Sequence, residues 1–279
     1  MKLSLTSWSL PACTLQEAAH ISKALGINEL DVGLLYRSSL DRKEMIADPQ
    51  SVAHKVRSLG IAIPNYYHLF GLGLSDRNLA MPGTIEQNAA DFEQVIEFCD
   101  LAEIQTVFVL PGVINPGQSR NDALAESARS LNALMRVAAR SKTVLTIEAH
   151  VHSYLESPSM VLQLLERVEG LKLTLDYAHF TCLGYRQEEI DPLAPHAAHV
   201  HLRQARPGVL QSKSNEGTIN MNAMFGTLRD SGYQGAMSLE YVHQDYMATR
   251  YDDVLTETIS LRDQFRSWVG LNLSGAEYG

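Results

Sequence analysis

The sequence predicts an α/β protein that folds as one (β/α)8 TIM barrel domain over residues 1–279. Eight apolar segments of strand length alternate with eight amphipathic segments of helical spacing, and this alternation is typical of parallel strands joined by right-handed crossovers. A chain of 279 residues is also close to the usual length of one such barrel. An open doubly wound sheet is the alternative, but no GxGxxG segment for a dinucleotide follows the first strand.

The individual elements follow from hydrophobic periodicity and from residues that start and stop helices. Strands are predicted, in chain order, at 2–8, 29–34, 61–67, 106–110, 143–149, 171–176, 199–203 and 236–241. Helices are predicted at 14–25, 49–59, 84–102, 121–140, 158–168, 187–193, 221–231 and 248–268. Gly26 and Gly60 close the first two helices as C-caps do, and Thr84 and Pro158 suit the starts of two later ones.

Charge and cysteine content limit the classes of partner and compartment. The formal net charge of −9 repels phosphate backbones, so no nucleic acid partner is expected. The cysteines, Cys13, Cys99 and Cys182, are far apart and form no CxxC pair, which favours free thiols in a reducing compartment. The first ten residues fit a strand better than a signal peptide, and no stretch reaches membrane-spanning length. We therefore expect a cytoplasmic protein without a membrane partner, and homo-oligomer formation stays open.

Four late strands share one pattern of side chains near their C-terminal ends. On one face, a small or polar residue is followed two positions later by a side chain that can bind a metal, and the opposite face is apolar. These metal-competent residues are Glu148, Asp176, His201 and Glu240. In a barrel the C-terminal ends of the strands surround one mouth, where active sites lie.

The convergence of these side chains predicts one divalent metal ion. Three carboxylates at one point repel each other and shift each other's pKa, and a divalent cation with oxygen and nitrogen ligands removes the repulsion. A single Asp or Glu at a strand end is more often a helix N-cap or a solvated loop residue, at odds of roughly two in three. Four such residues in phase on successive strands are much harder to attribute to chance.

The segments TIEAH, LDYAH, HVHL and NEGTINMNAMFGTLRDSGYQGAMSLEY resemble the sugar phosphate isomerase/epimerase family of xylose isomerase-like barrels. That family includes ketose 3-epimerases, hydroxypyruvate isomerase and inosose dehydratase, and it is related to endonuclease four. The resemblance implies that Glu148, Asp176, His201 and Glu240 bind Mn²⁺, with Mg²⁺, Co²⁺ or Zn²⁺ as alternatives. It also implies that His179, three residues after Asp176, contacts the substrate.

The sequence departs from the family at two places. The family's seventh strand often continues into an aspartate, whereas here His201 is followed by Leu202-Arg203-Gln204. The acid of a later glycine-containing segment is replaced by the amide of Asn220. Both departures concern the substrate rather than the metal site.

Four further residues are candidates for substrate binding. His150 has the strand parity of Glu148 and would line the pocket, although an exposed loop histidine is an equal alternative. His68 ends the third strand and Trp8 the first, so both could form pocket walls, with core packing as the alternative for Trp8. Arg203 could bind a phosphate or carboxylate of the substrate, or lie in a solvated loop.

These residues suggest proton transfer next to a carbonyl of a sugar, ketose or keto-polyol. The metal would polarise the carbonyl, and Glu148 and Glu240 would act as the acid/base pair. Return of the proton to the same carbon gives epimerisation, return to the neighbouring carbon gives isomerisation, and loss of a β-substituent makes the protein a lyase. The sequence leaves all three reactions open.

Two other classes of function compete with this interpretation. A metal-dependent endonuclease would need more histidine ligands and a basic groove, yet Leu110 stands at the end of the fourth strand. A non-catalytic sugar-binding barrel predicts loss of one or more of the four polar residues, and all four are present.

Overall fold

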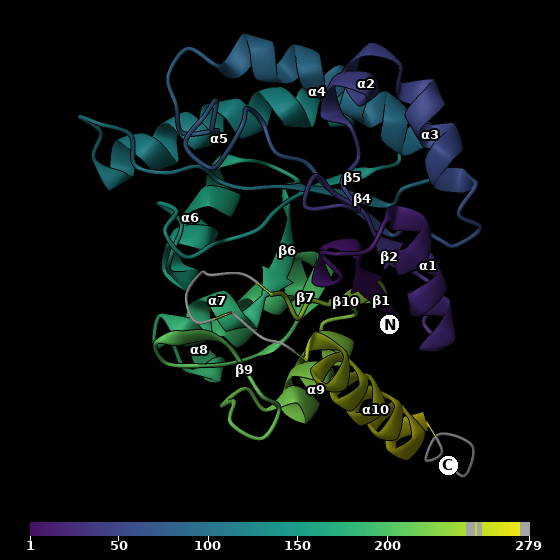
Figure 1. Cartoon of the computed structure of the whole chain (residues 1–279). Helices are drawn as coiled ribbons and strands as arrows, with labels where there is room; N and C mark the ends of the chain where they lie inside the picture. The colour runs from purple at the N-terminus through teal and green to yellow at the C-terminus, as the bar shows by residue number, and fades with distance from the viewer. Residues whose placement is uncertain (244–248, 250–252, 274–279) are drawn as a thin grey trace.

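A computed structural model of the protein describes residues 1–243, 249 and 253–273. Eight parallel strands form one sheet in the order β2-β1-β10-β7-β6-β5-β4-β3 (Figure 1). Their bounds are β1 Lys2–Thr6, β2 Leu30–Asp31, β3 Asn65–Tyr67, β4 Thr106–Val109, β5 Val144–Ile147, β6 Lys172–Asp176, β7 Ala197–Leu202 and β10 Ala236–Leu239. Single bridges from Glu29 to Ala62 and from Val32 to Tyr66 join the two outermost strands. The sheet therefore closes, and the predicted (β/α)8 barrel is confirmed.

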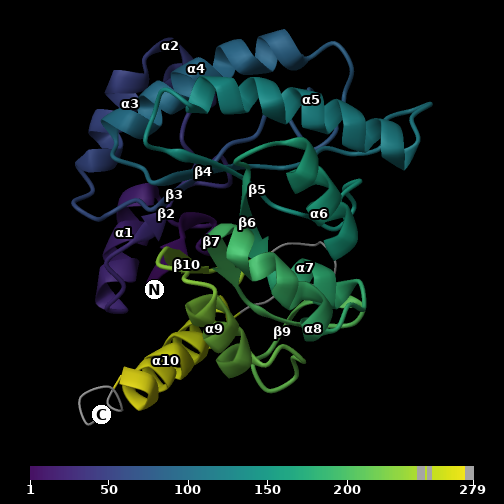
Figure 2. The same ribbon diagram turned by 180° about the vertical axis from the view of Figure 1, so that it is seen from behind.

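Helices surround this sheet on its outer side, as opposite views of the chain show (Figures 1 and 2). The α-helices are α1 Leu15–Ala24, α2 Arg42–Ala47, α3 Pro49–Arg57, α4 Ile85–Leu101, α5 Arg120–Ala138, α6 Pro158–Arg167, α7 Tyr177–Cys182, α8 Gln187–Ile190, α9 Met221–Asp230 and α10 Val254–Leu273. Short 3-10 helices lie at η1 Ser7–Ser9 and η2 Asp191–His196. Among the described residues, no helix is both long and apolar enough to cross a membrane.

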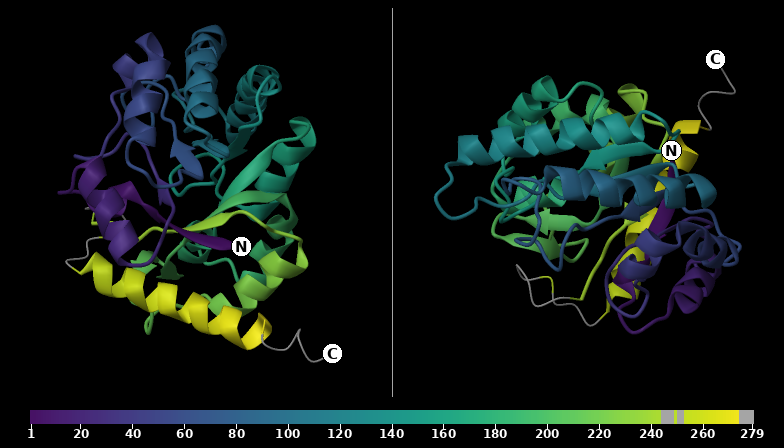
Figure 3. Two further views of the ribbon diagram at one scale, coloured as in Figure 1. Left: turned by 90° about the vertical axis from the view of Figure 1, so that its right-hand side faces the viewer. Right: turned by 90° about the horizontal axis from the view of Figure 1, so that it is seen from above.

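The first and the last strand of the barrel meet at one seam. Strand β1 pairs in parallel with β10, with Lys2 opposite Ala236 and Leu5 opposite Leu239 (Figure 3). Apolar side chains of the strands, such as Leu5 and Leu239, join those of the helices in one large buried core. This core holds the strands in register, and the register sets where their C-terminal side chains meet.

The structure also contains elements that the sequence did not predict. A hairpin of β8 Gln204–Arg206 and β9 Val209–Ser212 follows β7, and Gly208 supplies the positive φ of its turn. Helices α2 and α7 were not predicted either, because both are only six residues long and short helices have weak periodicity. The helix predicted at 248–268 is observed as α10; residues 248 and 250–252 of that prediction lie outside the described part.

Candidate active site

The four predicted metal ligands come together at the C-terminal ends of β5, β6, β7 and β10. All four are buried, and one ligand atom from each lies within 4.8 Å of the others. We call this set the ligand cluster; it consists of Glu148, Asp176, His201 and Glu240.

Strand register explains this convergence. Asp176 pairs with His201 across β6 and β7, and Ser238, two residues before Glu240, pairs with His201 across β7 and β10. Glu148 directly follows β5, and its N–H donates to the carbonyl of Val109 at 3.2 Å. Because alternate residues of a strand share a face, each of these side chains points into the barrel.

His201 is the centre of the ligand cluster. Its Nδ1 lies 2.6 Å from Glu148 Oε1 and 3.4 Å from Glu240 Oε2. Burial works to lower the pKa of His201, but the charges of Glu240 and Glu148 outweigh it and raise the pKa well above its ordinary value. For Glu148 the balance is opposite, because burial and the nearby carboxylates raise its pKa more than His201 lowers it.

Arg203 belongs to the same constellation. Its guanidinium lies 2.6 Å from Asp176 Oδ2 and 3.3 Å from Glu240 Oε2, and the side chain is buried. Burial works to raise the pKa of Glu240, but Arg203 and His201 lower it below its usual value. Arg203 therefore offsets part of the negative charge of the carboxylates, which the sequence alone suggested only a metal ion would neutralise. The alternative of a solvated loop residue is wrong, because Arg203 is buried.

Two of the ligand side chains also make supporting hydrogen bonds. Trp8, in η1, donates from Nε1 to Glu240 Oε1 at 2.7 Å. It also packs against Tyr67 and Phe108, so it is both a wall residue and a partner of the ligand cluster. Asp176 accepts from the N–H of Ala178 at 2.7 Å and so caps α7 while its other oxygen faces Arg203. Asp176 is thus both the N-cap of α7 and a member of the ligand cluster.

His179 and His150 lie next to the ligand cluster. His179 Nε2 is 3.6 Å from Asp176 Oδ2 and 3.1 Å from an Arg203 nitrogen. The ring centroids of His150 and His179 are 4.3 Å apart. Burial lowers the pKa of His150 to about 4 and that of His179 well below its ordinary value. Both imidazoles are therefore neutral near pH 7.

A cavity of about 350 Å³ opens above the ligand cluster. Its polar lining includes Glu148, His150, His179, Arg203 and Glu240, and its apolar lining includes Trp8, Tyr67, Phe108, Leu110 and Val242. A volume of this order suits a small organic molecule, with polar groups converging at one end.

His68 is placed differently from the other candidates. It is buried beside Tyr66, whose hydroxyl lies 3.2 Å from His68 Nδ1, and it packs edge-on against Phe70. It borders a separate cavity of about 10 Å³ and does not line the larger one. Its role in substrate binding stays a prediction without direct geometric support.

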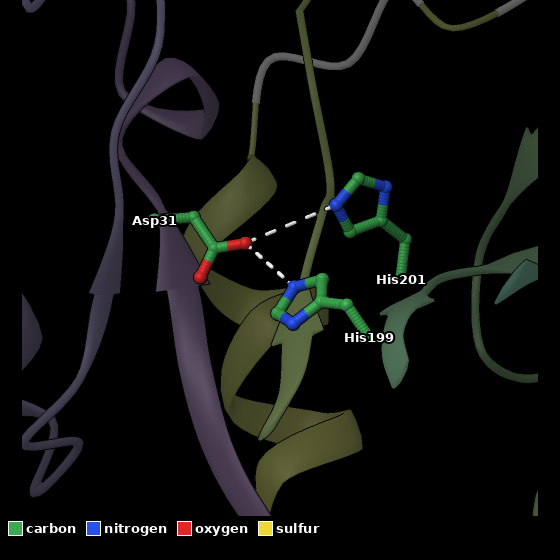
Figure 4. Close-up of side chains that lie close together, drawn as sticks. All are labelled: Asp31, His199 and His201. Carbon is green, nitrogen blue, oxygen red and sulfur yellow. Dashed lines mark hydrogen bonds and ion pairs between the residues drawn. The ribbon is translucent and has the colours of Figure 1, made fainter. Parts of the chain in front are cut away.

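A layer of polar side chains that was not predicted from the sequence lies beneath the ligand cluster. Asp31 Oδ2 lies 2.7 Å from His199 Nε2 and 3.9 Å from His201 Nε2, and it accepts from Asn65 Nδ2 at 3.0 Å. Figure 4 shows both imidazole rings directed at Asp31. Burial works to raise the pKa of Asp31, but the charge of His199 and its hydrogen bond outweigh burial and lower the pKa below its usual value. Asp31 is therefore a carboxylate. Its position at the end of a strand was the available signal, but residues 29–34 were predicted as one longer strand.

The ligand cluster has the composition and geometry of a divalent metal site. It offers three carboxylates and one imidazole, a donor set that suits Mn²⁺, Mg²⁺ or Zn²⁺. Glu240 Oε2 is buried and has no hydrogen-bond partner among the described residues, and such an atom gains from coordination. The residues present therefore fit a divalent ion.

Comparison with solved structures shows the same fold. A 3-keto-D-glucoside 4-epimerase from E. coli is 15% identical, with 96% of this chain and 99% of that chain covered and a TM-score of 0.71. A D-psicose 3-epimerase from Clostridium cellulolyticum H10, solved with D-tagatose, is 15% identical over 96% and 99%, with a TM-score of 0.72. An IolI protein with a bound zinc atom is 14% identical over 96% and 98%, with a TM-score of 0.70.

Sequence comparison identifies the family. A search of curated proteins found no match. Residues 20–262 match the family described as xylose isomerase-like TIM barrel. This match covers most of the chain, including all of the ligand cluster, and confirms the resemblance inferred from the motifs. The chain therefore belongs to the xylose isomerase-like TIM barrel family.

Proposed function

We propose that this protein is a divalent-metal-dependent isomerase or epimerase that acts on a sugar, ketose or keto-polyol. The observation that carries the proposal is the ligand cluster at the polar end of a cavity of small-molecule size. Membership of the family and the epimerases among the structural neighbours support the same class of reaction.

Glu148, Asp176, His201 and Glu240 would hold the ion, with Mn²⁺ as the expected metal. When bound, it would polarise a carbonyl oxygen and make the adjacent C–H more acidic. The zinc atom of the IolI protein supports a divalent ion on this fold. The protein itself then has to position the substrate and move the proton.

Glu148 and Glu240 are suited to proton transfer from two sides. They follow β5 and β10, which are separated in the sheet by β6 and β7. Their carboxyl groups therefore reach the ligand cluster from different directions. One can remove the proton from one face of the reacting carbon, and the other can return a proton to the opposite face, which inverts that carbon. Return to the neighbouring carbon gives isomerisation.

Three side chains would orient the substrate. His179, His150 and Arg203 line the cavity beside the ligand cluster and present N–H donors or ring nitrogens to substrate oxygens. Arg203 is the strongest donor of the three, and its charge favours an oxygen that becomes negative when the proton leaves. Trp8 and Phe108 offer aromatic surface to the C–H face of a sugar.

The test is proton exchange between a ketose and solvent deuterium oxide, with metal content measured in each variant. Glu148→Gln and Glu240→Gln keep the side-chain size and one ligand oxygen but cannot accept a proton near neutral pH. Each is expected to lower kcat by roughly 10²–10⁴-fold, the usual contribution of general acid–base catalysis. Glu126→Gln is the matched control, because Glu126 is a buried glutamate of α5 outside the cavity.

The products distinguish the reactions that the site permits. Deuterium on an inverted carbon indicates epimerisation, deuterium on the neighbouring carbon indicates isomerisation, and release of a β-substituent indicates a lyase. Exchange at the wild-type rate in both glutamine variants, with normal metal content, would remove Glu148 and Glu240 from the mechanism.

A further inference from the structure

The ring of His201 uses its two nitrogens in two different layers of the barrel. Nδ1 faces the ligand cluster, 2.6 Å from Glu148 Oε1, whereas Nε2 faces Asp31 Oδ2 at 3.9 Å. His201 and Asp31 are both buried. Nε2 has no hydrogen-bond partner among the described residues, and neither has Asp31 Oδ1.

This arrangement restricts where the proton of His201 can be. A ring nitrogen that binds a metal must carry no proton, and Nδ1 is the nitrogen on the side of the carboxylate ligands. The proton of the neutral ring is then on Nε2, where it requires an acceptor. Asp31 is the carboxylate on that side of the ring (Figure 4).

Asp31 is itself held by a polar layer that crosses the barrel. Asn65 on β3 donates to Asp31 Oδ2 at 3.0 Å, and Thr106 on β4 donates to Asn65 Oδ1 at 2.8 Å. His199 lies 2.7 Å from the same Asp31 oxygen and 3.2 Å from Ser238 Oγ. The interior of a (β/α)8 barrel is usually filled by branched apolar residues, and burying polar groups there instead carries a desolvation cost. A role in the site above it would account for this layer.

We infer that Asp31 is a positioning residue, which holds His201 in the Nε2–H tautomer and aims Nδ1 at the ligand cluster. A carboxylate behind a metal-binding histidine fixes its ring orientation and raises its basicity, and loss of such a partner commonly weakens metal binding by about 10–100-fold. The inference rests on the proposed metal site but not on the proposed reaction.

The experiment measures zinc binding to the full-length protein by competition with a chelating dye, without any substrate. Asp31→Ala removes the carboxylate that faces Nε2 of His201 and is expected to weaken zinc binding by about 10–100-fold. Asp31→Asn keeps an acceptor oxygen without the charge, so a smaller loss is expected, and this variant is nearly isosteric if the alanine variant does not fold. Asn65→Ala is the matched control: it removes another partner of the same Asp31 oxygen but leaves His201 untouched.

A second measurement reports the tautomer directly. In zinc-loaded protein labelled with ¹⁵N-histidine, His201 is expected to show a proton on Nε2, and in Asp31→Ala this signal should broaden or shift toward that of a solvent-exchanging ring. Equal losses of zinc affinity in Asp31→Ala and Asn65→Ala, or an unchanged Nε2–H signal, would overturn the inference. No zinc binding by the wild type would overturn it together with the metal site. Zinc binding without proton exchange would refute only the proposed reaction.

Discussion

Replacing His68 by glutamine is expected to change how the stability of the protein depends on pH. His68 is 1% exposed, and burial lowers its pKa from 6.5 to about 3. The unfolded chain therefore takes up a proton at this position as the pH falls through 6.5, whereas the folded protein takes it up only near pH 3. Since the unfolded state binds more protons in this interval, His68 makes the folded protein less stable as the pH falls.

The size of the effect follows from the two pKa values. Between pH 6.5 and 3 one such group changes the free energy of unfolding by about 1.4 kcal/mol per pH unit. Integration from pH 8 to pH 5 gives a loss of about 2 kcal/mol from His68. Glutamine does not titrate, so this loss disappears in His68→Gln. Any loss of the contact with Tyr66 is the same at every pH and cancels in the comparison.

Urea denaturation of the wild type and His68→Gln at pH 8, 6.5 and 5 measures this difference. The stability gap between the two proteins should shift by about 2 kcal/mol in favour of the variant from pH 8 to pH 5. His20→Gln, the same replacement at an exposed histidine, is the matched control. Parallel curves for wild type and His68→Gln would refute the reasoning. Unchanged proton exchange in the variant would assign His68 to the structure rather than to substrate binding.

Three further outcomes are expected. Trp8→Phe removes the hydrogen bond to Glu240 and should cost about 1.5–3 kcal/mol in urea denaturation; a loss within experimental error would show that this bond contributes nothing. At a metal concentration of 100 times Kd, adding a chelator should remove about 2.7 kcal/mol and lower Tm by roughly 5–10 °C, whereas an unchanged Tm would argue against the metal site. The chain should unfold in one calorimetric transition, and two separate transitions would contradict one domain over residues 1–279.

The ligand cluster could be predicted from the sequence because its signal is local and repeated. Each ligand lies at the C-terminal end of a strand of four to six residues, either within it or directly after it. The two-residue period of the strand shows which face the ligand occupies. Parallel strands place their C-terminal ends on one side of the barrel. Glu148, Asp176, His201 and Glu240 were therefore identified together, although no single position was decisive.

The polar layer around Asp31 could not be predicted in the same way. β2 has two residues and β3 has three, which is too short for a period to be measured. Asp31 therefore looked like an interior position of a longer strand. Its partners, Asn65 and His199, come from distant parts of the chain and meet only after the sheet has closed. The pairing depends on tertiary contacts that a pattern along one segment does not contain.

Arg203 connects the charge of the site with its proposed chemistry. When a metal ion is bound, the carboxylate ligands are ionised and the imidazole ligand is neutral. Three carboxylates then contribute −3 and Arg203 contributes +1, so the constellation carries −3 + 1 = −2. A divalent ion would bring this sum to zero, whereas without Arg203 it would leave −1. A substrate oxygen that becomes negative during proton removal would then lie beside a site with no net charge instead of a negatively charged one. A preorganised cation in a buried site also stabilises such a charge strongly. Arg203 lies two residues after His201, on the same face of the chain, and this spacing brings the compensating charge to the ligand cluster.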